Sequence, residues 1–132
     1  MTALRVLLVD DERDFVDTLR MRLDTRGVEA ECVYSADEAL AWLTERGGEL
    51  PVDVVVLDLR MPGMSGLEAM ELVQARWPKV GRIMLTGHGA EDVAASVARL
   101  GGHYLSKPVD IARLVDTLRI AGLGSRTGDA AP

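Results

Sequence analysis

Short apolar runs alternate with longer amphipathic segments along this chain, and this alternation constrains its fold more than any other feature. The run from Val6 to Val9 is too short and too uniformly apolar for a surface helix, and it suits a strand buried on both faces. The run from Val54 to Leu57 is the strongest strand signal in the sequence. Because strands and helical patterns follow each other in strict order, the sequence predicts an α/β fold with a parallel sheet.

Five strands and five helices are expected. The predicted strands are Val6–Val9, Glu29–Tyr34, Val52–Leu57, Val80–Leu85 and Tyr104–Leu105, and the predicted helices are Glu12–Arg26, one opening at the possible capping box of Ser35 and Glu38, Leu67–Trp77, Glu91–Leu100 and one through Ile111 and Leu118. This pattern favours a doubly wound, five-stranded, flavodoxin-like sheet with strand order 2-1-3-4-5. Residues 1–121 are predicted to form one domain, and the small and polar residues 122–132 a flexible tail or linker stub.

Composition narrows the possible functions. The 132 residues include 15 Lys and Arg against 21 Asp and Glu, and the net charge of −6 argues against direct nucleic-acid binding. The single cysteine, Cys32, excludes an internal disulfide and a multi-cysteine metal site. The sequence has neither an apolar run of membrane-spanning length nor the layout of a signal peptide. We therefore expect a soluble, cytoplasmic domain.

Residues that carry chemistry follow the ends of four predicted strands. They are Asp10, Asp11 and Glu12 after the first strand, Asp58 after the third, Thr86 at the fourth and Lys107 with Pro108 after the fifth. Ligands of open parallel sheets bind beyond these carboxyl ends. Clustered carboxylates repel one another unless a cation neutralises them, and an all-oxygen set favours Mg²⁺ when phosphate is also bound. The sequence therefore predicts a hard divalent cation at this edge.

Each of these residues also has a simpler interpretation. The acidic segment that begins at Asp10 could merely complement the dipole of the following helix. Asp58 could cap a loop, although a carboxylate at the end of a buried strand is costly unless something pairs with it. Lys107 is one of only two lysines, which favours a role as a compact point charge. Pro108 could hold a cis bond and aim Lys107 inward, whereas His88 and His103 fit surface positions.

Four segments resemble the receiver domain of two-component response regulators. They are Val9–Glu12, Leu57–Gly66, Leu85–His88 and Tyr104–Pro108, within a match from about Leu4 to about Ala121. Each segment alone is a weak signal for this family. Four segments in the right order, each at a predicted strand end, form a specific signal.

The resemblance implies a phosphorylation site. Asp58 would accept a phosphoryl group from the phosphohistidine of a sensor histidine kinase or a phosphotransfer protein. Asp11, Asp58 and the backbone carbonyl of Arg60 would hold Mg²⁺ directly, and Asp10 would act through bound water. Lys107 would pair with the phosphoryl group. The domain would be a phosphorylated signalling switch rather than a turnover enzyme.

The resemblance also implies how the signal leaves the site. Thr86 would donate its hydroxyl to a phosphoryl oxygen, and Tyr104 would swing inward behind it. This movement would change the face formed by the fourth helix, the fifth strand and the fifth helix, which is also a possible homodimer surface. The stretch before Tyr104 is one residue shorter than usual and carries Gly102 and His103, so we expect an unusual shape next to the fourth helix.

Three other functions fit the sequence less well. A phosphohydrolase of the aspartyl-phosphate kind needs a carboxylate two positions after its nucleophile, and this chain has Arg60 there. The Arg60 side chain could instead affect how long a phosphoryl group stays on Asp58. A flavin-binding module needs a Ser/Thr/Gly-rich loop after the first strand. A degenerate receiver does not fit the intact motifs. Two contexts stay open: a stand-alone phosphorelay intermediate, and a receiver cut from a longer transcriptional regulator.

Overall fold

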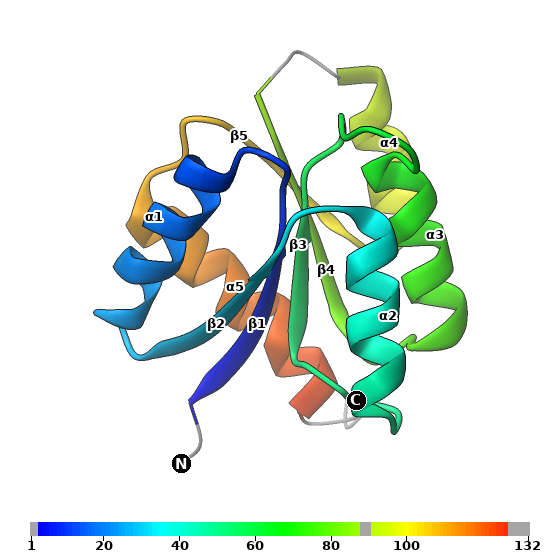
Figure 1. Cartoon of the computed structure of the whole chain (residues 1–132), viewed down its shortest axis with the longest axis horizontal. Coiled ribbons are helices and arrows are strands. Elements are labelled where there is room, and N and C mark those ends of the chain that lie inside the picture. Colours follow the sequence, from blue (N-terminus) through cyan, green and yellow to red (C-terminus); the bar gives the residue numbers. More distant parts are fainter. Residues whose placement is uncertain (1–2, 88–90, 127–132) are drawn as a thin grey trace.

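The alternation of segments forms the predicted α/β architecture (Figure 1). This computed structural model describes residues 3–87 and 91–126. The elements in chain order are β1 (Leu4–Val9), α1 (Arg13–Asp24), β2 (Val28–Val33), α2 (Ala36–Arg46), β3 (Val54–Leu57), α3 (Gly66–Arg76), β4 (Gly81–Thr86), α4 (Glu91–Arg99), β5 (His103–Ser106) and α5 (Ile111–Arg126). None of the helices in this part of the chain is long and apolar enough to cross a membrane.

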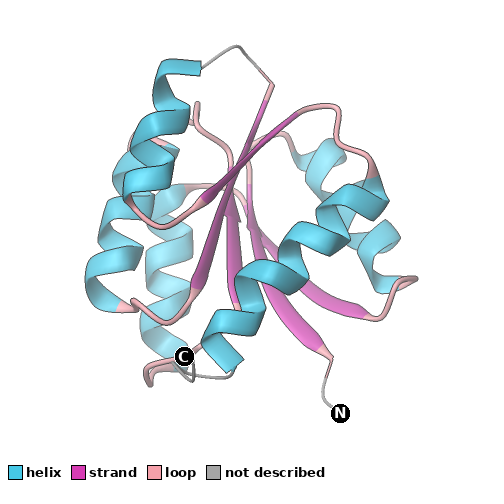
Figure 2. Cartoon of the chain, turned by 180° about the vertical axis from the view of Figure 1, so that it is seen from behind, coloured by secondary structure: helices cyan, strands magenta, loops and turns pink. Residues whose placement is uncertain are grey.

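The five strands form one parallel sheet in the order β2-β1-β3-β4-β5, which confirms the predicted topology. The register pairs Val9 with Leu57 and Leu57 with Met84, so β1, β3 and β4 end close to the same edge. This edge lies at the top of Figure 1. Helices α1 and α5 cover one face of the sheet and α2, α3 and α4 cover the other (Figure 2).

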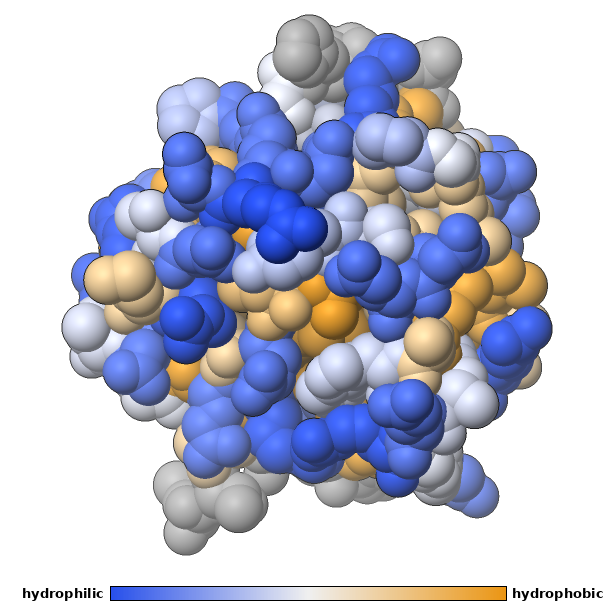
Figure 3. All heavy atoms as spheres, viewed as in Figure 1, coloured by the Kyte–Doolittle hydropathy of each residue, from blue (hydrophilic) through white to orange (hydrophobic). Residues whose placement is uncertain are grey.

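Two apolar clusters, one on each face of the sheet, form the core. Leu7, Val9, Val55, Leu57 and Met84 pack toward α2, α3 and α4, while Val6, Leu8, Val54, Val56, Ile83 and Leu85 pack toward α1 and α5. The central strands are therefore buried on both faces, as their uniformly apolar runs predicted. On the face drawn in Figure 3, hydrophilic residues dominate and apolar residues form small separate areas.

Helix α5 is longer than the sequence predicted. It continues to Arg126, five residues into the segment that we expected to be a tail or linker stub. Gly122 explains the difference: a Cβ atom at this position would lie 2.7 Å from Cδ1 of Leu4 and 3.3 Å from Cγ2 of Val54. A glycine that suggested a flexible tail instead allows the helix to pack closely against β1 and β3. The rest of the predicted tail, residues 127–132, lies outside the described residues.

The start of α2 follows the predicted capping pattern only in part. The Ser35 hydroxyl accepts a hydrogen bond from the Glu38 amide at 3.1 Å, as expected. The Glu38 carboxylate, however, accepts from the amide of Tyr34 at 2.9 Å, one residue before the cap. The complete reciprocal capping box lies at α3, between Ser65 and Glu68, where the sequence analysis did not predict it.

Arg82 at the start of β4 is a buried anchor that sequence reasoning missed. Its guanidinium donates to the carbonyls of Val80 at 2.7 Å, Leu100 at 3.1 Å and Pro78 at 3.3 Å. Burial lowers the pKa of this arginine. The side chain thus ties the turn before β4 to the end of α4. Gly101, with φ near +72°, lies so close that a Cβ atom there would be 2.9 Å from Nη2 of Arg82.

Replacing Arg82 by methionine should lower the free energy of unfolding by about 1–3 kcal/mol, because buried carbonyls lose their donors. Urea unfolding at neutral pH measures this change through the midpoint at constant m-value. Arg99→Met is the matched control, because Arg99 is exposed and donates only to the neighbouring Ser96 hydroxyl among the contacts of the described residues. Equal losses in the two variants would contradict the anchoring role.

Candidate functional site

Three carboxylates meet where the strand order changes direction, between β1 and β3. Asp10 and Asp11 follow β1, and Asp58 follows β3, where its amide donates to the carbonyl of Val9 at 3.0 Å. One carboxylate oxygen from each aspartate lies within 4.8 Å of the others. Asp10 and Asp58 are buried, with 4% and 7% of their surface exposed, whereas Asp11 is exposed. The structure therefore brings together the acidic residues that the sequence placed at separate strand ends.

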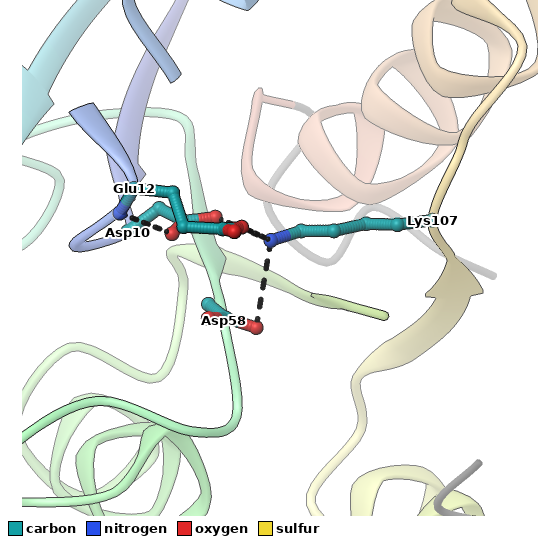
Figure 4. Close-up of polar contacts among 4 residues, drawn as sticks. All are labelled: Asp10, Glu12, Asp58 and Lys107. Carbon is teal, nitrogen blue, oxygen red and sulfur yellow. Dashed lines mark hydrogen bonds and ion pairs between the residues drawn. The ribbon is translucent and has the colours of Figure 1, made fainter. Parts of the chain in front are cut away.

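Lys107 reaches this cluster from the end of β5 (Figure 4). Its ammonium group donates to Oδ2 of Asp10 and to Oε1 of Glu12, both at 2.8 Å, and lies 3.8 Å from Oδ1 of Asp58. The same Nζ atom lies 4.4 Å from the centre of the Phe15 ring. The Lys107–Pro108 bond is cis, one of the two forms that the sequence left open. A lysine from the end of β5 is thus held mainly by residues of the segment that follows β1.

Burial and charge shift the pKa values of the two central groups. Burial is the main cause that raises the pKa of Asp58, and the nearby Asp10 charge adds to it. Lys107, the Thr86 hydroxyl and the Leu59 amide oppose this rise. Burial acts to lower the pKa of Lys107, but its bonds to Asp10 and Glu12 outweigh burial and raise it. The lysine therefore stays charged, while repulsion between Asp58 and Asp10 persists beside it.

The donor set fits a hard divalent cation. Three aspartates offer oxygen ligands within a short span, and a single ammonium group leaves their mutual repulsion incompletely offset. Oxygen ligands of this kind suit Mg²⁺, which is held through one or two carboxylates and often through a substrate phosphate. Arg60 lies two residues after Asp58 with its side chain exposed. Its proposed use as a backbone ligand stays a prediction.

The remaining predicted residues lie around this cluster. Thr86 ends β4 and is 2% exposed, and its hydroxyl is one of the groups that oppose the rise in the pKa of Asp58. Tyr104 on β5 is half-buried and packs against the apolar cluster beneath α2, α3 and α4. His88 lies outside the described residues. Sequence reasoning missed the contacts of Glu12 and Phe15 with Lys107, and only their place in the first turn after β1 hinted at them.

Comparison with known proteins decides the family. A model of the response regulator receiver domain matches residues 6–119. The chain belongs to this family. This receiver domain is 42% identical over 118 residues to the hydrogenase transcriptional regulatory protein HoxA of Cupriavidus necator, covering 88% of the chain and 23% of HoxA. It is 35% identical over 127 residues to the response regulator PilR of Pseudomonas aeruginosa, covering 92% of the chain and 26% of PilR.

Solved structures agree with this assignment. The receiver domain resembles the crystal structure of a response regulator receiver domain protein from Clostridium thermocellum with a TM-score of 0.86 and 30% identity, covering 93% of this chain and 97% of that one. The chain spans about a quarter of the length of the curated relatives it matches. It is therefore a signalling domain, of the kind that in response regulators partners with histidine kinases.

The raised pKa of Asp58 predicts that Asp58→Asn stabilises the receiver domain at pH 7 in the presence of EDTA. In the wild type, the unfolded chain loses this proton first as pH rises, so stability falls between the ordinary pKa of about 3.9 and the raised folded value. The stability gap between variant and wild type should therefore narrow as pH falls through this window. Urea unfolding of both proteins at several pH values measures this difference in the free energy of unfolding.

The control for this experiment is Asp116→Asn, which removes one charge from an exposed position of α5. Addition of Mg²⁺ should stabilise the wild type more than Asp58→Asn, because only the wild type keeps all three carboxylates. A variant less stable than the wild type at pH 7 without metal would contradict the repulsion inferred here.

Proposed function

We propose that this receiver domain accepts a phosphoryl group on Asp58 from the phosphohistidine of a sensor histidine kinase or a phosphotransfer protein. A carboxylate oxygen of Asp58 attacks phosphorus, the P–N bond breaks, and its electron pair stays on the imidazole, which takes up a proton. One observation carries this proposal: the buried Asp58 carboxylate lies beside an acidic pair and 3.8 Å from the Lys107 ammonium. Aspartyl phosphates are established covalent intermediates.

The neighbours of Asp58 have separate tasks in this proposal. Asp11, Asp58 and the Arg60 backbone carbonyl would hold Mg²⁺, with Asp10 acting through water. When bound, the ion supplies positive charge to the phosphoryl oxygens. Lys107 supplies a second positive charge beside Asp10 and Asp58, and its raised pKa keeps it protonated.

Thr86 and Tyr104 would carry the signal away from the acidic site. The buried Thr86 hydroxyl opposes the rise in the pKa of Asp58, and we infer that it donates to an oxygen on a phosphorylated Asp58. Tyr104 lies on the adjacent strand, and the backbone amide of Lys107 donates to the Thr86 carbonyl at 2.9 Å. Movement of Thr86 would thus be passed to β5 and to the face formed by α4, β5 and α5, where we also place a possible homodimer contact.

The wider setting follows from the relatives. HoxA and PilR are regulators about four times as long as this chain, which supports a receiver acting within a longer transcriptional regulator rather than a stand-alone relay. Such a regulator works in the cytoplasm, and its DNA contacts would lie outside this domain of net charge −6. Arg60, in place of an acid–base carboxylate, supports a switch without turnover of outside substrates.

Asp58→Asn should abolish labelling by a small phosphodonor such as phosphoramidate in the presence of Mg²⁺. An amide has no ionised oxygen with which to attack phosphorus, while its size and shape are preserved. Intact-protein mass spectrometry detects the added phosphoryl group. Asp37→Asn, at the exposed start of α2, is the control and should label like the wild type. Full labelling of Asp58→Asn would remove the central assignment.

Labelling should also need the metal, so EDTA should suppress it in the wild type. Asp11→Asn should weaken Mg²⁺ binding by about tenfold or more, since even partners outside the ligand shell change metal affinity by about 10–100-fold. Isothermal titration calorimetry with MgCl₂ measures the change, with Asp37→Asn as the control. Equal Mg²⁺ affinities in Asp11→Asn and the wild type would contradict the metal assignment.

A further inference from the structure

Glu12 is the residue at the site to which the proposed phosphoryl chemistry gives no task. Its carboxylate accepts a hydrogen bond from the Lys107 ammonium at 2.8 Å, as short as the bond from Lys107 to Asp10. The distance from this ammonium to Asp58 is longer, at 3.8 Å. In the resting domain, therefore, the lysine that the proposed reaction needs at Asp58 is held on the side of β1 and α1 (Figure 4).

The local structure around Glu12 favours this contact. Glu12 occupies the N-cap of α1, a position where Ser, Thr, Asp or Asn normally accepts a hydrogen bond from the first turn. The Glu12 side chain makes no such capping bond to the described first turn of α1. Its amide instead donates to Oδ1 of Asp10 at 2.9 Å, which fixes its backbone at the rim of the site. The side chain is directed to Lys107 rather than to its own helix.

A second contact from α1 holds the same ammonium group. Phe15 lies one helical turn after Glu12, and its ring centre is 4.4 Å from Nζ of Lys107. The aromatic face attracts the cation without offering it a carboxylate. Because the Lys107 side chain is only 13% exposed, these contacts together restrict the positions that its ammonium group can occupy.

We propose that Glu12 is a positioning residue that keeps Lys107 closer to β1 than to Asp58, with which it forms only a longer ion pair of 3.8 Å in the resting receiver domain, and that Glu12 competes with the phosphoryl group for this lysine. The inference rests on the function proposed above and adds to it a residue that opposes the movement of Lys107 toward Asp58. A phosphoryl group on Asp58 brings about two negative charges close to Lys107. Drawing the lysine toward this group breaks or stretches its bond to Glu12. The charge of Glu12 therefore sets how readily the site holds a phosphoryl-like anion.

The position of Lys107 can be tested without any phosphoryl chemistry. The chain has only two lysines, so protein labelled with ¹³C-lysine gives two sets of ε-methylene NMR signals. In metal-free protein, Glu12→Gln should shift the Lys107 signals. The signals of Lys79, which pairs with Glu49 on the surface, should stay unchanged. Asp14→Asn removes an exposed charge from the same helix turn and should shift neither set. Unchanged Lys107 signals in Glu12→Gln would overturn the proposal.

The competition is tested with beryllofluoride, a phosphoryl mimic, added together with Mg²⁺ and followed by ¹⁹F NMR. Glu12→Gln should bind it about two- to fivefold more tightly than the wild type, the range expected when one partly exposed ion pair is removed. Glu12→Asp keeps the charge but withdraws it by one methylene group, and it should also bind more tightly. Asp14→Asn should match the wild type.

The variants separate the possible explanations. Equal affinities of the wild type and Glu12→Gln would overturn the competition. Two outcomes would show a general charge effect and overturn the specific contact. In one, Glu12→Gln binds beryllofluoride more tightly but Glu12→Asp binds it like the wild type. In the other, Asp14→Asn binds it as tightly as Glu12→Gln. If the wild type binds no beryllofluoride, the proposed phosphoacceptor function fails, and the lysine spectra alone decide whether Glu12 holds Lys107.

Discussion

The repulsion among the carboxylates at the ends of β1 and β3 is the constraint on which the rest of this site depends. Asp10 and Asp58 are buried, and the cost of burying each charge falls only when a cation is close. Lys107 supplies that charge from a position 97 residues away from Asp10 in the chain. In the strand order β2-β1-β3-β4-β5, β3 and β4 separate β1 from β5, so roughly 14 Å divide their axes. A long side chain at the end of the sheet is therefore needed to join them.

The topology and the placement of most site residues could be predicted from the sequence because they depend on local patterns. Uniformly apolar runs identify strands buried on both faces, and the residue after each run is placed at the common edge by the parallel arrangement alone. Glu12 shows the limit of this reasoning. Its contact with Lys107 depends on a side-chain direction at a helix N-cap, where the sequence pattern predicts only a favourable charge near the helix dipole.

Arg82 and Gly122 show the same limit in the packing. A charged residue near the start of a strand is normally exposed, yet Arg82 is buried because three backbone carbonyls face it. Gly122 resembled the start of a flexible tail, yet its missing side chain makes room for Leu4 and Val54. The partners of Gly122 are distant in the sequence, and two of the three carbonyls around Arg82 lie in the turn just before β4, where composition and periodicity do not show which way the side chain points.

The contacts of Lys107 also join parts of the domain that the sheet order keeps apart. Glu12 and Phe15 on the α1 side hold its ammonium group, while its backbone amide donates to Thr86 at the end of β4. The strand that ends just before this lysine carries Tyr104. In the function proposed above, a shift of the ammonium group toward Asp58 would lengthen its contacts with Glu12 and Phe15, and the residue that moves would be the one that follows β5. Because α1 and β5 belong to opposite ends of the chain, one side chain would couple the N-terminal part of the site to the face through which the proposed signal leaves.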